Sequence, residues 1–264
     1  MSRSFDTPDW HRAVAGLIGA DGDRDIADGL GRALSVAVEH DATCLLAFHH
    51  DAPPDVLHHT MSVKRARHYL DRYLAGPYLL DPLYQLALRT DKPSICRCRD
   101  ETPDRFRSSE YYRQYYDRTH LADEMDFLLD VENSTTLVLV VGRWEKRFTR
   151  SEVADLRLVE PIVTAALRRL WETWADRHSG DERDLSMHQR LTQCFDRFGE
   201  GTLTQRERQI TQLLLRGHSS KSVARELDIA PGTVMVHKRN LFSKLGITSQ
   251  YELFSLFIDR LSTF

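Results

Sequence analysis

The segment between Leu203 and Leu253 constrains the fold of this 264-residue chain more than any other stretch. It holds short runs of apolar residues at helical spacing, and these runs are separated by polar turn residues and glycines. Lysines and arginines lie between the apolar positions. Short helices that are joined by tight turns and carry cations are typical of a helix-turn-helix unit, which places one helix in the major groove of DNA. The segment therefore predicts an all-α DNA-binding unit.

Four helices are predicted in this unit from the residues at their ends. Thr204 and Glu207 have the spacing of a capping box, which starts the first helix. Gly217 is placed to end that helix as a left-handed C-terminal residue, and a short second helix follows it. Thr233 is predicted to cap the third helix and Ser249 to cap the fourth. The order and lengths of these helices favour a compact four-helix domain.

The third helix separates an apolar face from a face that is free to meet DNA bases. At 100° per residue, Val234 and Leu241 point to the core side. The opposite face carries the predicted base-contacting residues, which are Met235, Val236, Arg239 and Asn240. Among these types, arginine suits a bidentate contact to guanine and asparagine suits adenine. The residues predicted to contact phosphates are Ser219, Lys221, Thr233, Lys238 and Lys244.

Charge is distributed unevenly along the chain. The formal net charge is −3, which by itself argues against binding to nucleic acid. From Gly201 onward, however, nine lysines and arginines face five aspartates and glutamates, so this tail is net positive. The first 200 residues are net negative. We therefore expect only the C-terminal segment to meet the phosphates of double-stranded DNA.

The segment resembles the C-terminal domain of the LuxR/NarL family of transcription regulators. The residues that match in identity and spacing are Leu203, Thr204, Arg206, Glu207, Gly217, Ser219, Lys221, Val223, Ala224, Leu227, Ile229, Thr233, Val234, His237, Lys244 and Leu245. The resemblance implies that the third helix enters the major groove and that the fourth helix dimerises through Leu253, Phe257 and Leu261. It also implies a homodimeric activator that contacts RNA polymerase. Met235 departs from the family, which usually has lysine or arginine there.

The first 176 residues predict a separate α+β domain. Helical spacing near the N-terminus, with Thr7 as the first cap, leads into a buried strand over 42–48 and a hairpin over 126–141. A long helix then starts at a capping box formed by Thr149 and Glu152, and Pro161 is expected to kink or split it. About five antiparallel strands flanked by helices form a sandwich that can enclose a small molecule.

This α+β domain is predicted to sense a small-molecule effector. Its order of elements resembles GAF/PAS-like sensor domains. Residues 177–201 are expected to form a linker with a short amphipathic helix, and residues 202–264 form the DNA-binding domain. A phosphorylated receiver domain is disfavoured, because the alternating strands and helices of that fold are missing. The sequence in this region leaves open whether the domain binds a ligand or serves only as a protein-interaction module.

Tyr69, Tyr73 and Asp81 are the candidate effector contacts. Their arrangement partly matches the pocket signature of the acyl-homoserine lactone branch of the family, Trp-x-x-x-Tyr followed by Asp-Pro. Here Tyr69 replaces the tryptophan, and Asp81 lies one residue closer. We therefore expect a polar or amine-bearing effector rather than a lactone. Tyr115, within a tyrosine-rich stretch predicted as a helix over 106–120, is a further candidate. The alternative is that these side chains only pack in the core.

Three other patterns have both a functional and a purely structural interpretation. Histidines at 49, 50, 58 and 59 flank a predicted hairpin and could serve a metal-dependent hydrolytic enzyme, but exposed hairpin residues are expected instead. Cys96 and Cys98 share one face of a strand, where two thiols alone make neither a metal site nor a redox sensor. The acidic run Asp123–Asp126 could be a cation-recognition site, but an exposed strand edge is expected instead.

The whole chain is expected to be a cytoplasmic, non-enzymatic protein that needs neither metal nor cofactor. It has no signal peptide and no apolar run of membrane-spanning length, so no membrane association is expected. Four cysteines in a chain of this size do not indicate a disulfide framework. No nucleophile-elbow or phosphate-loop pattern is found, so the sequence favours a regulator over an enzyme.

Overall fold

The computed structural model describes residues 5–131, 134–178 and 185–262. By their contacts these residues form two compact units. The sheet unit comprises the residues up to His68, Leu86–Glu101, and those from His120 to the end of the long helix at His178. The helical unit comprises Tyr69–Gln85, Thr102–Thr119 and the chain from Leu185 onward. None of the helices in the described ranges is both long and apolar enough to serve as a membrane span.

A five-stranded antiparallel sheet forms the centre of the sheet unit. Its spatial order is β2-β1-β5-β4-β3, so the hairpin of β4 and β5 lies in the middle and β2 and β3 are the edges. The strands are β1 (Ala42–His49), β2 (Asp55–His59), β3 (Ile95–Arg97), β4 (Asp123–Val131) and β5 (Thr135–Arg143). The predicted antiparallel α+β architecture is confirmed.

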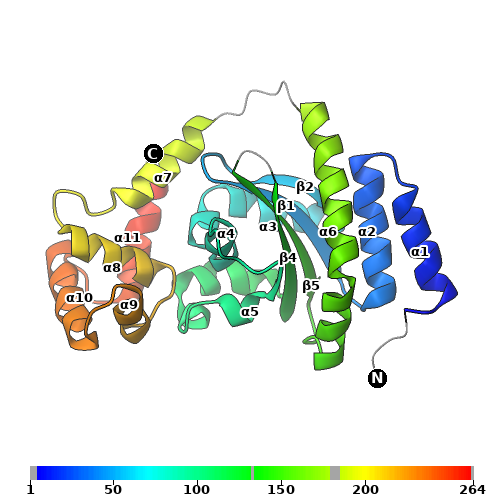
Figure 1. Ribbon diagram of the computed structural model, residues 1–264. Helices are drawn as coiled ribbons and strands as arrows, with labels where there is room; N and C mark the ends of the chain where they lie inside the picture. Colours follow the sequence, from blue (N-terminus) through cyan, green and yellow to red (C-terminus); the bar gives the residue numbers. More distant parts are fainter. Residues whose placement is uncertain (1–4, 132–133, 179–184, 263–264) are drawn as a thin grey trace. The chain divides into compact units, whose positions relative to one another are not determined.

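Three helices cover one face of this sheet: α1 (Pro8–Ile18), α2 (Asp23–Ala37) and α6 (Arg150–His178). Figure 1 shows them standing side by side on that face. Because side chains alternate along a strand, Met125, Phe127 and Leu139 point into the core beneath these helices. The even-numbered residues of β4 and β5 therefore belong to the opposite face.

The predicted N-terminal caps of α1 and α6 are confirmed. Thr7 accepts a hydrogen bond from the Trp10 N–H (3.2 Å), and Thr149 with Glu152 closes a capping box at α6. The expectation that Pro161 splits α6 is wrong, because the helix runs through this residue without a break. Burial of the helix against the sheet outweighs the one backbone hydrogen bond that proline cannot donate.

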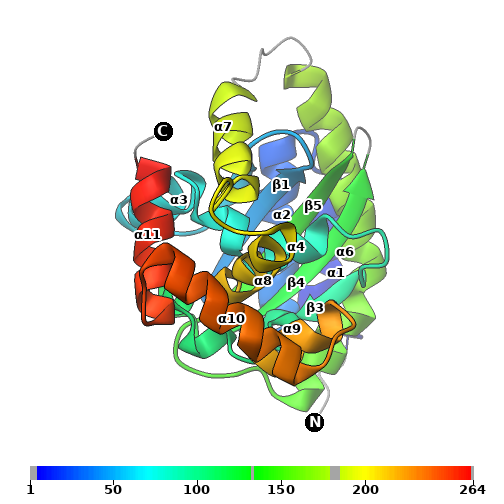
Figure 2. The same ribbon diagram turned by 90° about the vertical axis from the view of Figure 1, so that its left-hand side faces the viewer.

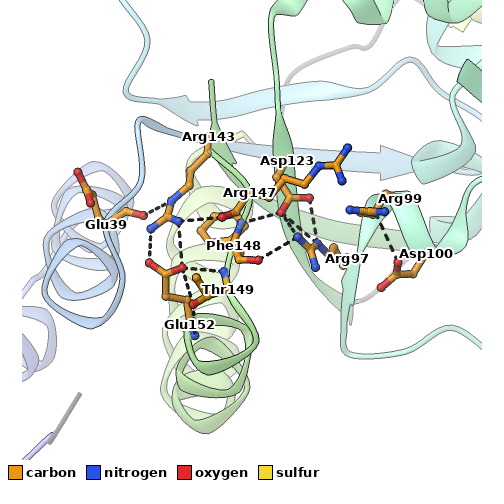
Figure 3. A network of polar contacts seen from close by, with 10 residues as sticks. All are labelled: Glu39, Arg97, Arg99, Asp100, Asp123, Arg143, Arg147, Phe148, Thr149 and Glu152. Carbon is orange, nitrogen blue, oxygen red and sulfur yellow. Dashed lines mark hydrogen bonds and ion pairs between the residues drawn. The ribbon is translucent and has the colours of Figure 1, made fainter. Parts of the chain in front are cut away.

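A polar network joins β3, β4 and β5 to the start of α6 (Figure 3). Arg143 makes a bidentate pair with Glu152, at 2.6 and 3.0 Å, and also donates to the Glu39 carbonyl. These bonds hold the pKa of Glu152 at about 2, although burial acts in the opposite direction. Asp123 pairs with Arg97 and accepts from the Phe148 N–H (2.9 Å). Both carboxylates thereby fix the turn that leads into α6.

Two predictions about the middle of the chain are wrong. The stretch 106–120 is not one α-helix: it forms η2 (Phe106–Ser108), a π-helical turn η3 (Tyr112–Tyr116) and η4 (Asp117–Thr119). Aromatic packing explains the break, since the Phe106 ring contacts Tyr111, Tyr112 and Tyr116 at once. The acidic run Asp123–Asp126 is not an exposed edge, because β4 is an inner strand and all four residues are buried.

The C-terminal part of the helical unit consists of five helices. They are α7 (Leu185–Asp196), α8 (Gln205–Leu215), α9 (Ser220–Glu226), α10 (Pro231–Leu245) and α11 (Gln250–Ser262). In Figure 2, α10 is nearest the viewer, with α8 and α9 behind it. Phe257 of α11 lies edge-on against Phe195 and Phe198. The remaining segments of the unit hold α3 (Val63–Leu74, from Tyr69 on), η1 (Pro77–Leu80) and α4 (Pro82–Ala87, up to Gln85).

The predicted helix ends in this part are largely confirmed. Gly217 has φ +93°, and the N–H groups of Gly217 and His218 bond back to Leu214 and Leu213, which is a Schellman ending of α8. Ser249 caps α11. The prediction for Thr233 is wrong: α10 begins at Pro231 with Ala230 as N-cap. Proline is favoured at the first helical position, since its φ is already helical and no N–H is lost there.

Candidate functional site

The outward face of α10 presents the four predicted base-contacting residues together. Met235 is 65% exposed and Val236 48% exposed, and Arg239 and Asn240 are exposed one turn later. On the other side of the helix Val234 and Leu241 are fully buried. The face predicted from the helical wheel is thus open to solvent, in the helix that follows the turn after α9.

Glu207 anchors α10 to the start of α8. Its carboxylate accepts from the Thr204 N–H (2.8 Å) and from Lys244 Nζ (2.7 Å), while its own N–H donates to Thr204. Burial alone would raise the pKa of this carboxyl, but the bonds from Lys244 and Thr204 outweigh it and lower the pKa below its ordinary value. One carboxylate therefore joins the start of α8 to the end of α10 through a residue 37 positions further along the chain.

The predicted phosphate contacts fall into two groups. Lys221 and Thr233 are exposed at the starts of α9 and α10. Lys244 is bound to Glu207, and Lys238 lies over the Phe242 ring at 5.3 Å, so both already have partners in the unit. Burial, followed by the nearby Arg105, lowers the pKa of Lys238. The structure thus leaves fewer free cations beside α10 than the sequence indicated.

Ser219, the fifth predicted phosphate contact, donates both of its hydrogen bonds to Asp104. The Ser219 N–H donates to one carboxylate oxygen of Asp104 (3.0 Å) and its hydroxyl donates to the other (2.5 Å). Next to it, the Arg105 N–H donates to the Gly217 carbonyl (3.1 Å). A Cβ on Gly217 would lie 3.0 Å from the Phe106 backbone, so glycine permits this close approach. Nothing in the sequence signalled this contact, because 115 residues separate the partners.

Tyr73 and Asp81 lie together, as predicted. The Tyr73 hydroxyl donates to the Asp81 carboxylate (2.7 Å), whose other oxygen accepts the Leu83 N–H at the start of α4 (2.9 Å). Burial raises the pKa of Asp81 to about 6, against the effect of these two bonds. Tyr115 stacks on Tyr111 at 6.0 Å, and Tyr111 raises the pKa of Tyr73 after burial and Asp81. Tyr69 is partly buried on α3.

The histidines of the β1–β2 hairpin do not converge on a common point. His49 is 1% exposed, and its ring nitrogens lie 2.8 Å from Thr135 Oγ1 and 3.0 Å from Asp55. His58 instead pairs with Asp28 of α2 (3.0 Å). Their expected exposure is wrong for His49, which is a core residue. In the part of the chain that the structure describes, the group of ligand atoms close enough for a metal ion involves none of these histidines.

Two of the three residues predicted to dimerise are buried within the chain itself. Leu253 and Phe257 both have 0% exposure. Phe257 packs on α7, so neither side chain is presented to a second copy here. The side chain of Leu261 lies outside the described residues. Tyr251, 57% exposed, is the large apolar side chain that α11 does present.

The comparisons with known proteins agree with this description. The family model of "bacterial regulatory proteins, luxR family" matches residues 201–257, which include α8, α9 and α10. A putative HTH-type transcriptional regulator of Aeromonas salmonicida is 35% identical over 159 residues, covering 58% of this chain and 81% of that protein. The monoamine regulon transcriptional regulator of Klebsiella aerogenes is 25% identical over 203 residues, covering 77% of each.

A solved structure is similar to a large part of the chain. The crystal structure of the VqsR LBD domain from Pseudomonas aeruginosa superposes with a TM-score of 0.57 at 25% sequence identity. The match covers 63% of this chain and 99% of that one.

Proposed function

The chain belongs to the luxR family of bacterial regulatory proteins, and from this premise we propose that it binds double-stranded DNA through α10 under the control of a small molecule. The observation that carries the proposal is the exposed set Met235, Val236, Arg239 and Asn240, opposite a fully buried face. The arginine reads guanine, the asparagine reads adenine, and the two apolar side chains contact thymine methyl groups. In this proposal the protein is a cytoplasmic homodimer that activates transcription through RNA polymerase.

The proposal is tested with the full chain and DNA from upstream of its own gene and the neighbouring genes. Fluorescence anisotropy over a range of salt concentrations is expected to show specific binding whose affinity falls steeply with salt. Footprinting should then give a protected site with two-fold symmetry, as a homodimer requires. Equal affinity for all fragments, with no protected site, would refute the assignment of α10 as a reading helix.

We assign the effector contact to the cluster of Tyr73 and Asp81. A buried carboxylate that accepts from a tyrosine is suited to hold an N–H or ammonium group of a ligand. One relative of this chain is named for a monoamine regulon, which supports an amine-bearing effector. The competing proposal is a module that binds only proteins, and it is favoured by the fact that Asp81 already accepts two hydrogen bonds inside the unit.

Replacing Asp81 by asparagine separates these two proposals. Primary monoamines and acyl-homoserine lactones are screened by thermal shift, because a ligand that binds only the folded state raises its Tm. A compound that stabilises the natural chain is expected to lose this effect in Asp81→Asn and to keep it in the control Asp71→Asn, where the exposed aspartate lies on α3. For an amine, the shift should also fade as the pH falls below about 6, where Asp81 becomes protonated and neutral. No shift from any compound would favour the protein-binding module.

We further propose that the Asp104 carboxylate competes with a DNA phosphate for the hydrogen-bond donors of Ser219. A phosphate at Ser219 needs the same N–H and hydroxyl donors that the Asp104 carboxylate now holds. Asp104→Asn weakens the competitor, so affinity for a cognate DNA fragment is expected to rise by about 3- to 10-fold, which corresponds to about one surface hydrogen bond to a charge. Asp117→Asn, an exposed aspartate of the same segment, is the matched control. Equal affinity of both variants and the natural chain would contradict this role.

A further inference from the structure

One end of the sheet brings cysteines and carboxylates to a common face. Cys96 of β3 lies directly opposite Asp126 of β4 in the antiparallel register. Glu124 precedes Asp126 by two residues on β4, so these two and Cys96 belong to the same face. This is the face opposite the core side chains Met125 and Phe127. Cys98, the first residue of the helix after β3, has its thiol beside the same two carboxylates. The sequence indicated the pair of thiols and the acidic run separately, but not that they lie beside each other.

The four side chains are close together and inaccessible to solvent. Ligand atoms of Cys98, Glu124 and Asp126 all lie within 4.8 Å of one another. The Cys96 thiol is 4.0 Å from the Asp126 carboxylate. Exposure is 3% for each cysteine, 6% for Glu124 and 0% for Asp126. A buried cluster of this kind differs from the exposed acidic groups that are common on protein surfaces.

We propose that Cys96, Cys98, Glu124 and Asp126 bind one Zn²⁺ ion. Zinc accepts both thiolate sulfur, at about 2.3 Å, and carboxylate oxygen, at about 2.0–2.2 Å, in a tetrahedral set of four. Cys98, Glu124 and Asp126, whose ligand atoms lie within 4.8 Å of one another, supply three of the four ligands, and Cys96 supplies the fourth from its position 4.0 Å from the Asp126 carboxylate. Magnesium and calcium select oxygen ligands alone, and the two thiols therefore favour zinc over them.

The metal-free thiols are not arranged for oxidation chemistry. Cys96 and Cys98 are each only 3% exposed to solvent. Redox sensors need accessible cysteines with a lowered pKa, so a sensor of oxidants does not fit this cluster. A divalent cation suits these four side chains better, because thiolates and carboxylates together neutralise its charge.

The position of the site suggests what the ion does. β3 is an edge strand of only three residues, Ile95–Arg97, and the four-residue helix α5 (Cys98–Glu101) follows at once. Two ligands come from this short stretch and two from the inner strand β4. An ion held by all four ties the end of the sheet together and orders the chain that leads out of β3.

The test uses the full chain, stripped of metal with a chelator and kept reduced. Zn²⁺ is titrated against a chromophoric chelator, and Co²⁺ is added separately as a spectroscopic probe. We expect one tightly bound Zn²⁺ per chain, and a thiolate-to-cobalt charge-transfer band with tetrahedral d–d bands. Cys98→Ser and Asp126→Asn should each weaken Zn²⁺ binding by at least about 100-fold, since even groups that only orient a ligand contribute 10- to 100-fold. Cys194→Ser, a buried cysteine of α7, is the control and should bind normally.

Asp126→Asn preserves the size of the side chain, so it keeps the test meaningful where Cys98→Ser fails to fold, as judged by circular dichroism. Zinc bound equally well by Asp126→Asn would overturn the proposal. A cobalt complex without a thiolate band would also overturn it, because the ion would then sit on histidines or surface carboxylates. The test of zinc binding does not depend on whether the metal-free chain binds DNA. The zinc proposal is therefore independent of the function assigned to α10.

Discussion

Replacing Arg239 by alanine should lower the affinity for a cognate DNA site by about 10- to 100-fold, because one bidentate contact to guanine contributes about 1–3 kcal/mol of discrimination. The loss should be confined to specific sequence, and affinity for unrelated DNA should change little, since phosphate contacts dominate that binding. Arg239 is exposed on α10, so its removal should leave the Tm unchanged.

Arg260→Ala is the matched control, because this exposed arginine lies on α11, away from the reading face. Fluorescence anisotropy with the cognate fragment and with a scrambled fragment measures the affinity for the specific site and for unrelated DNA. An Arg239→Ala chain that footprints the same site with unchanged affinity would place base reading elsewhere. Met235→Lys, which restores the cation that is usual in the family at this position, is a useful companion.

Replacing Glu207 by alanine should destabilise the C-terminal helices by about 2–3 kcal/mol, the value of a helix cap together with a buried charged hydrogen bond. The change removes the capping box of α8 and leaves Lys244 without the partner that holds the end of α10. Thermal unfolding followed by circular dichroism should show a Tm lower by roughly 10 °C. Glu226→Ala, an exposed glutamate of α9, should have little effect.

The pH dependence of this effect has a definite sign. The pKa of Glu207 is lower in the folded chain than its ordinary value, so its stabilisation is complete above about pH 4–5 and is lost as the pH falls through the folded pKa. The stability gap between the natural chain and Glu207→Gln should therefore be largest near neutral pH and close on acidification. A gap that stays constant from pH 7 to about pH 3 would show that the carboxylate charge is unimportant.

The same residues show which features a sequence reveals. Thr204 and Glu207 are three residues apart, so their capping box follows from local spacing, as does Gly217 at the end of α8. The face of α10 follows from helical periodicity for the same reason. Lys244 was predicted to meet phosphate, and its bond to Glu207 could not be inferred, because only the packed fold brings the two residues together.

Other predictions were wrong because they depended on strand order or on packing between rings. Glu124 and Asp126 were interpreted as exposed because acidic side chains rarely occupy an inner strand, and nothing local identifies β4 as one. Tyr73 and Asp81 are only eight residues apart, and a signature of the family indicated them. The broken helix at 106–120 has good helical spacing, but Phe106 draws three tyrosine rings to one point, which a regular helix does not allow.

In the proposed competition between Asp104 and DNA, the strength of the contact with Ser219 limits how completely this protein can be kept off its promoter. Two exposed hydrogen bonds to a carboxylate stabilise the form in which Asp104 holds Ser219 by about 1 kcal/mol. Roughly one molecule in six then has Ser219 released and available to a DNA phosphate at any time. Apparent affinity for DNA then falls only by that factor. A promoter governed through this contact alone would show measurable basal expression and a graded response, with full silence requiring a second restraint.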